Sequence, residues 1–98
     1  MAVGEYRGSK LFTVASGKDT HEAWREPTEG RFTAWIGNIG PNGARGGGAG
    51  ITVEGGGAST TLPLYQWQRI DFKRTIELHG YEGQPGTMVK IDVYDRID

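Results

Sequence analysis

Two segments of the chain show the period of two residues that a half-buried β-strand requires. Their inward positions are apolar, and they are Phe32, Ala34, Ile36, Val89, Ile91 and Val93. The opposite positions include Trp35 and Tyr94. We therefore expect strands over residues 30–36 and 88–97.

Further strands are predicted where β-branched and aromatic residues gather, at residues 10–15, 51–53 and 60–64. Residues 20–25 predict a short strand or one helical turn, because Pro27 soon ends any helix. In residues 64–79 the apolar positions change phase, which predicts a bulge or bend near Gln68-Arg69 or Lys73-Arg74. Trp67 is expected in the core, and the last two strands are expected to form an antiparallel hairpin.

Short strands separated by turns indicate an all-β protein. We expect a compact antiparallel β-sandwich or jelly-roll-like barrel of about six to eight short strands, with little or no helix. The length of 98 residues predicts one domain, 1–98. A domain this small can gain stability by docking on copies of itself or on a larger body.

A glycine tract interrupts this pattern from Gly37 to Gly57, where ten of 21 residues are glycine. Glycine brings no side chain to bury and loses the most backbone freedom on ordering. The tract is therefore predicted to be a long loop, 37–57, that is strand-like only at residues 51–53. A flexible surface loop and a loop ordered against a neighbouring subunit both stay open.

Candidate catalytic chemistry is sparse. The glycine tract lacks the Gly-Lys-Ser/Thr ending of a phosphate loop, and no serine lies in a nucleophile elbow. The chain has no cysteine, which excludes disulfides, thiolate catalysis and cysteine-bound zinc. His21 and His79 each have a glutamate nearby, but neither pair makes a complete metal site. We expect no enzyme, no cofactor and no metal.

Charge and hydropathy limit the classes of binding partner that we expect for the chain. The formal net charge is −1, and no cluster of Lys and Arg indicates nucleic acid or an anionic membrane. No apolar stretch approaches the ~20 residues that a membrane-spanning helix needs. The expected partners are therefore proteins.

Aromatic residues on the predicted outward positions are candidates for such contacts, because Trp and Tyr combine a large apolar face with a polar edge. Trp35 lies opposite the inward row and directly before the glycine tract, and Tyr94 is outward on the final strand. The candidate interaction residues are Trp35, Asn38, Arg45, Gly47 and Tyr94.

The glycine tract, the alternating pattern of residues 64–97 and the near-neutral charge resemble small β-rich bacteriophage virion proteins of the capsid decoration or cement type. The resemblance implies a non-enzymatic assembly protein that docks on copies of itself or on larger capsid or tail subunits and resides in the virion. The alternative is a lectin-like carbohydrate-binding module, in which Trp35, Trp24 or Tyr65 would stack on a sugar ring.

Overall fold

The computed structural model describes residues 3–14, 19–41, 47–56, 60–80 and 87–97. Within them the chain forms eight strands and no helix. The strands are β1 (Val3–Val14), β2 (His21–Arg25), β3 (Phe32–Pro41), β4 (Ala49–Val53), β5 (Thr60–Leu62), β6 (Trp67–Phe72), β7 (Thr75–His79) and β8 (Thr87–Arg96). The predicted all-β class and the number of strands are confirmed.

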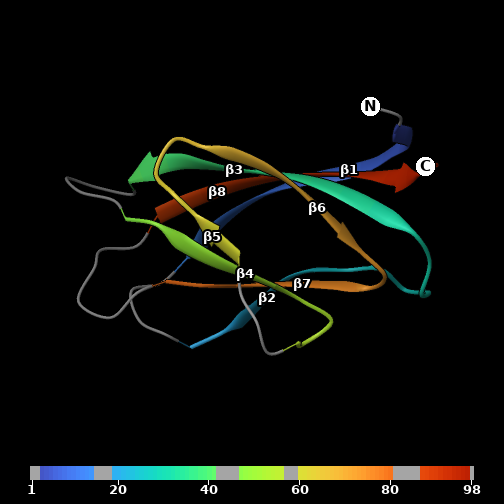
Figure 1. Ribbon diagram of the computed structural model, residues 1–98, viewed down its shortest axis with the longest axis horizontal. Helices are drawn as coiled ribbons and strands as arrows, with labels where there is room; N and C mark the ends of the chain where they lie inside the picture. The colour runs from blue at the N-terminus through green and yellow to red at the C-terminus, as the bar shows by residue number, and fades with distance from the viewer. Residues whose placement is uncertain (1–2, 15–18, 42–46, 57–59, 81–86, 98) are drawn as a thin grey trace.

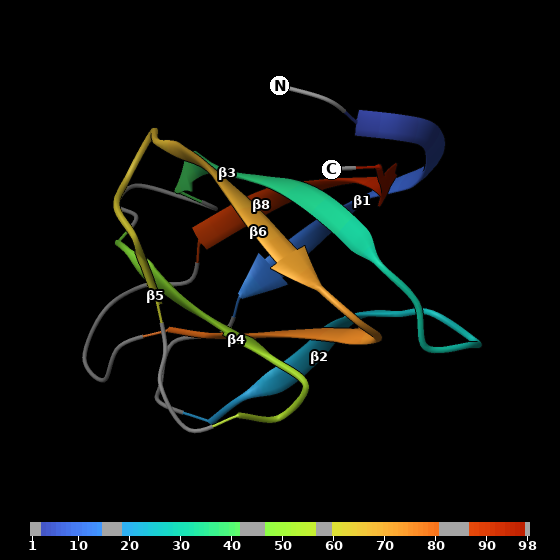
Figure 2. The ribbon, with the colours of Figure 1, turned by 45° about the vertical axis from the view of Figure 1, so that its right-hand side comes forward.

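The strands build two four-stranded antiparallel sheets that face each other (Figure 1). The first sheet has the order β1-β8-β3-β6, and the second has the order β2-β7-β4-β5. Except between β4 and β5, each step along the chain passes from one sheet to the other (Figure 2). Eight strands in two sheets with this order form a jelly roll, so the predicted sandwich or jelly roll is confirmed.

The core lies between the sheets. Alternation along each strand sends apolar side chains inward, as the sequence pattern predicts for β3 and β8. The buried apolar residues are Val14, Ala23, Phe32, Ala34, Ile36, Ala49, Ile51, Leu62, Phe72, Ile76, Leu78, Val89, Ile91 and Val93. Nine strand-borne Ile, Leu and Val side chains in this set supply most of the hydrophobic stabilisation.

The expected hairpin of the last two strands is wrong. β7 lies in the second sheet between β2 and β4, whereas β8 lies in the first sheet between β1 and β3. Both strands have the alternation of a hairpin arm, but each buries its apolar face from the opposite side of the core. The alternation of apolar and polar residues determines which face of a strand is buried, but it does not determine which strand lies beside it.

The predicted bend at Lys73-Arg74 is confirmed, and it is the corner where the chain leaves the first sheet for the second. The Glu54 carboxylate, which follows β4, holds this corner. Its Oε1 accepts hydrogen bonds from the backbone N–H groups of Lys73 (2.9 Å), Arg74 (2.7 Å) and Thr75 (3.1 Å). One carboxylate oxygen thus satisfies three consecutive backbone donors at the corner.

Most of the described glycine tract is strand, not loop. Its first five residues complete β3, which pairs with both β6 and β8, and residues 49–53 form β4 between β5 and β7. The prediction that residues 37–57 form a long loop, strand-like only at 51–53, is therefore wrong for this part. Residues 42–46 and 57 lie outside the described residues.

Two glycines of the tract lie beneath rings of the neighbouring strand. Gly37 pairs with Trp67, and Gly50 pairs with His79. A Cβ at Gly37 would overlap the Trp67 indole, and a Cβ at Gly50 would overlap the His79 imidazole. Because glycine has no side chain, the two rings can lie against the sheet. They cover backbone that would otherwise be exposed to solvent.

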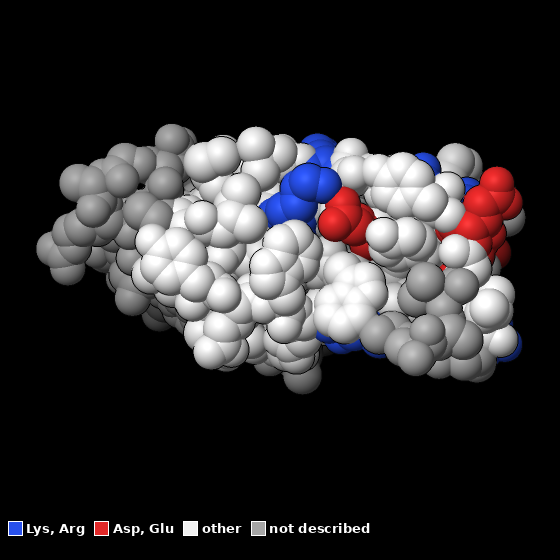
Figure 3. Space-filling view, turned by 90° about the horizontal axis from the view of Figure 1, so that it is seen from above, with Lys and Arg blue, Asp and Glu red and all other residues white. Residues whose placement is uncertain are grey.

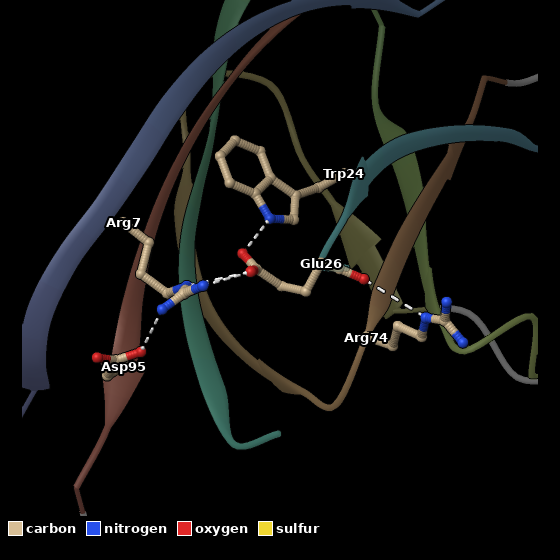
Figure 4. A network of polar contacts seen from close by, with 5 residues as sticks. All are labelled: Arg7, Trp24, Glu26, Arg74 and Asp95. Carbon is tan, nitrogen blue, oxygen red and sulfur yellow. Dashed lines mark hydrogen bonds and ion pairs between the residues drawn. The ribbon is translucent and has the colours of Figure 1, made fainter. Parts of the chain in front are cut away.

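A polar network joins the two sheets along the side where β1 and β2 lie (Figure 4). The buried Glu26 carboxylate accepts hydrogen bonds from Arg7 Nε (3.1 Å), Arg7 Nη2 (2.7 Å) and Trp24 Nε1 (2.8 Å). Arg7 also donates to Asp95 (3.1 Å), and Arg74 donates to the Glu26 carbonyl (3.4 Å). These contacts close one open side of the sandwich.

Candidate functional site

The outer face of the first sheet, the side of β1, β8, β3 and β6 that turns away from the second sheet, carries most of the exposed large apolar side chains of the described residues. Six large hydrophobic residues of the described chain are exposed, and all lie on these strands or directly beside them. They are Tyr6, Leu11, Ile39, Tyr65, Trp67 and Ile97. Within the described residues the second sheet has no counterpart. Figure 3, which looks onto this face, shows a mostly uncharged surface.

The predicted contact residues Trp35 and Tyr94 belong to this face. Their neighbours Ala34, Ile36 and Val93 are fully buried, so alternation turns Trp35 and Tyr94 outward, and both are half-buried. Trp35 pairs across the strands with Asp92 and Arg69, which places it at the centre of the sheet. The structure brings both residues to one surface, and their contact with a partner stays a prediction.

Asn38 and Gly47 serve the interior of the subunit instead. The Asn38 side chain is fully buried and donates hydrogen bonds to the carbonyls of Gly47 (2.9 Å) and Leu62 (3.3 Å). Its Oδ1 accepts hydrogen bonds from Gly40 N–H (3.2 Å) and from the Thr87 hydroxyl (2.9 Å). Asn38 therefore ties strand ends together and offers a partner no surface.

Arg45 lies outside the described residues, so the structure gives no position for it.

Trp67 was expected in the core and is in fact 49% exposed. It is in phase with Arg69 and Asp71, which point outward, and out of phase with Ile70 and Phe72, which face the core. The phase change in residues 64–79 was the signal that could have placed it. The nearby Tyr65 lies over Gly40 in the same manner, with a Cβ at Gly40 falling 2.7 Å from its ring.

Tyr6 completes the aromatic surface at the β1 edge. Its ring packs against Tyr94 with centroids 5.5 Å apart, and its hydroxyl is hydrogen-bonded to Ser9. Aromatic rings thus occur on all four strands of the sheet or beside them. Rings of this type dominate the energetics of protein interfaces.

Charged side chains on this face are paired with one another. Lys90 Nζ lies 2.6 Å from Asp92, and Arg69 Nε lies 3.0 Å from Asp71. Asp71 also accepts a hydrogen bond from the Thr33 hydroxyl (2.8 Å) and lies 3.3 Å from Arg96. Burial raises the pKa of Asp71, but these donors outweigh burial and hold the pKa below its ordinary value. The face therefore combines apolar area with locally neutralised charge.

A cleft opens on the side of the sandwich opposite the Arg7 network, between β6 and the β4–β5 pair. Its volume is about 340 Å³. The lining residues are Ile51, Val53, Thr60, Gln68, Arg69, Ile70 and Asp71. Arg69 and Asp71 also belong to the outer face of the first sheet, so the cleft borders that surface.

The described residues offer neither a metal-binding cluster nor a membrane-spanning helix. No three His, Cys, Asp or Glu side chains there gather closely enough to hold a metal ion. The same residues form no helix long and apolar enough to cross a membrane. Trp24, one of the rings considered for sugar stacking, is engaged through its indole N–H with Glu26.

Comparisons with known proteins identify the fold. No protein-family model and no curated protein matches the chain. A solved structure described as "Bacillus endospore appendages form a novel family of disulfide-linked pili" matches 100% of this chain and 96% of its own, with a TM-score of 0.59 and 9% sequence identity. The chain therefore shares the fold of that Bacillus appendage structure over its whole length.

Proposed function

We propose that this chain is a non-enzymatic structural subunit that assembles with copies of itself through the outer face of the first sheet. The observation that carries the proposal is the one-sided distribution of exposed hydrophobic residues described above. An exposed apolar patch of this kind marks an interaction surface in a soluble protein. A sandwich needs only the inner faces of its sheets to form a core, so the aromatic outer face calls for another explanation.

Size and charge favour a second copy as the partner. The face is bounded by the longest and the shortest dimensions of the molecule, 38 and 19 Å. A rectangle of these sides has an area of the same order as the ~800 Å² that each partner contributes to a standard interface. Its Lys90–Asp92 and Arg69–Asp71 pairs give the face both signs of charge. Two identical faces of this kind do not repel each other and can exchange ion pairs.

The structural comparison supports an assembly role in a general way, because the matching structure is described as a pilus. That pilus is described as disulfide-linked, whereas these 98 residues contain no cysteine. Copies of these 98 residues therefore cannot be joined by disulfides, which makes the apolar face more important for their association.

The finer setting that we propose is a bacteriophage particle, in which the subunit would decorate capsid or tail subunits and reside in the virion. The sequence resemblance supports it, and jelly rolls occur in viral capsid domains. Co-sedimentation with capsids stripped of their own decoration subunits tests this setting, and absence of binding would leave self-assembly as the role.

Self-assembly is tested by sedimentation velocity over a range of protein concentrations. Leu11 on β1 and Ile39 on β3 are both exposed on the face, so Leu11→Glu with Ile39→Glu adds two unpaired charges without disturbing the core. The unaltered protein should form larger species as concentration rises, and the double variant should stay monomeric.

Thr61→Glu provides the control, because it places the same carboxylate on an exposed position of β5 in the second sheet. It should assemble like the unaltered protein. Thermal melting of each variant shows that the fold is intact. A protein that is monomeric at every concentration, or a double variant that assembles normally, would contradict the proposal.

A further inference from the structure

The cleft between β6 and the β4–β5 pair has walls of two kinds. Ile51 and Val53 from β4 and Ile70 from β6 form an aliphatic wall. Gln68 lies on the same side of β6 as Ile70 and Phe72, opposite the inward Ile36 of β3, so its amide is directed into the cleft. A polar amide thus stands where the rest of the row is apolar.

The polar groups of the cleft are open to a ligand. Within the described residues, neither the Gln68 amide nor the Thr60 hydroxyl has a side-chain hydrogen bond to the protein, and both line the cleft. An amide and a hydroxyl each offer both donors and acceptors. Together they can pair with groups that also donate and accept.

Asp71 supplies a fixed acceptor at the rim. Its Oδ1 accepts hydrogen bonds from Thr33 (2.8 Å) and Arg69 (3.0 Å), and its Oδ2 lies 3.3 Å from Arg96. A carboxylate held by several donors keeps its position and its charge, and its oxygens still have lone pairs for further donors. This acceptor is therefore preorganised before any ligand arrives.

The charges of the rim offset each other. The Arg69 guanidinium is paired with the Asp71 carboxylate, so the pair gives no net attraction to either an anionic or a cationic ligand. The polar groups also disfavour a purely apolar ligand, because binding would strip water from the Gln68 amide without replacing its hydrogen bonds. A neutral ligand with several hydroxyl groups meets all of these conditions.

We propose that this cleft binds a neutral polyhydroxy compound of monosaccharide size. Its hydroxyls would pair with Gln68, Thr60 and Asp71, and its C–H face would lie on Ile51, Val53 and Ile70. The volume of about 340 Å³ is at the small end of the ~300–1,000 Å³ typical of ligand sites. This site differs from the ring-stacking platform predicted from sequence, and it is independent of self-assembly.

The test is a titration of isotopically labelled protein, followed by amide chemical shifts, with glucose, galactose, mannose and N-acetylglucosamine. At least one sugar should shift the resonances of residues 51–53 and 68–71 in a saturable way at millimolar concentrations. Acetate and hexanol, an anion and an apolar alcohol, should not. If no sugar shifts these resonances, or if the shifts map to another surface, the proposal fails.

Variants locate the site. Gln68→Ala and Thr60→Val should each weaken binding roughly 5- to 10-fold, the loss expected for a neutral hydrogen bond. Gln66→Ala removes an exposed amide two residues away that does not line the cleft, and it should bind normally. Equal losses in Gln68→Ala and Gln66→Ala would overturn the assignment. Repeating the titration on the Leu11→Glu, Ile39→Glu variant separates sugar binding from assembly, because the cleft should be intact there.

Discussion

The indole of Trp67 lies over the backbone of Gly37, its partner across the β3–β6 pair. No other residue type leaves room for the ring, because a Cβ at position 37 would overlap the indole. The pair places an exposed aromatic ring on the outer face and at the same time covers a glycine that has no side chain of its own.

Gly37→Ala should therefore destabilise the protein by about 1–3 kcal/mol, as overpacking usually does. The sign should reverse when the ring is absent. In a Trp67→Ala background, alanine at position 37 should be neutral or stabilising by roughly 0.5–1 kcal/mol, because glycine is unfavourable inside a strand. Urea unfolding of the four proteins of this double-mutant cycle measures the coupling. Equal costs in both backgrounds would show that the ring does not depend on the glycine.

Asn38→Ala should cost about 2–3 kcal/mol, because it removes several buried hydrogen bonds and leaves the carbonyl of Leu62 short of a donor. Thr87→Val removes only the hydroxyl partner and should cost less. Gln66→Ala, which removes an exposed amide, should leave the midpoint of urea unfolding unchanged. A neutral Asn38→Ala would mean that water replaces the buried amide.

Glu26→Gln should destabilise the protein by about 1–3 kcal/mol, since hydrogen bonds to a charged group are stronger than neutral ones. Arg7 would lose its ion pair with Glu26 and keep only the one with Asp95, so the contact between the two sheets at the β1–β2 side would weaken. Glu29→Gln is the matched control, because Glu29 is exposed. Denaturant unfolding compares the two variants. Similar midpoints would show that the Arg7–Glu26 network does not stabilise the protein.

Acid should weaken the fold through the same carboxylate. Burial raises the pKa of Glu26, but hydrogen bonds from Arg7 and Trp24 outweigh burial and lower the pKa below its ordinary value. A group with a lowered pKa in the folded state stabilises the protein above its unfolded pKa, about 4.3 for glutamate, and that contribution disappears as the pH falls through the folded value.

Urea midpoints measured from neutral pH to pH 3 should therefore fall less in Glu26→Gln than in the unaltered protein, since the variant has no charge to lose at this site. Asp71, whose pKa is also lowered, contributes in the same direction in both proteins. Parallel pH profiles for the unaltered protein and Glu26→Gln would show that Glu26 does not contribute to the acid sensitivity.

The strands that bury one regular face could be predicted from sequence. Phe32, Ala34 and Ile36 face the core as their alternation requires, and the corner at Lys73-Arg74 lies where the pattern breaks. The neighbours of each strand could not be predicted, because β7 and β8 would show the same alternation as a hairpin or in separate sheets.

The candidate site was predicted only in part, for a related reason. Trp35 and Tyr94 lie on regular strands, so their outward direction follows from their neighbours. Trp67 was misplaced because a large aromatic residue is typical of a core, and its glycine partner Gly37 is 30 positions away. Asn38 was misplaced because a polar residue beside glycines is typical of a surface turn, whereas here it satisfies buried backbone groups.

Pairing between rings and glycines also has an evolutionary consequence. Substitutions at positions 37 and 67, and at 50 and 79, should be inherited together in related chains, so that a side chain arises at one position only when the ring is lost from the other. The positions of glycines in such chains would then show where aromatic rings lie on the sheets. A relative with fewer glycines should have fewer exposed aromatic rings and a weaker tendency to associate.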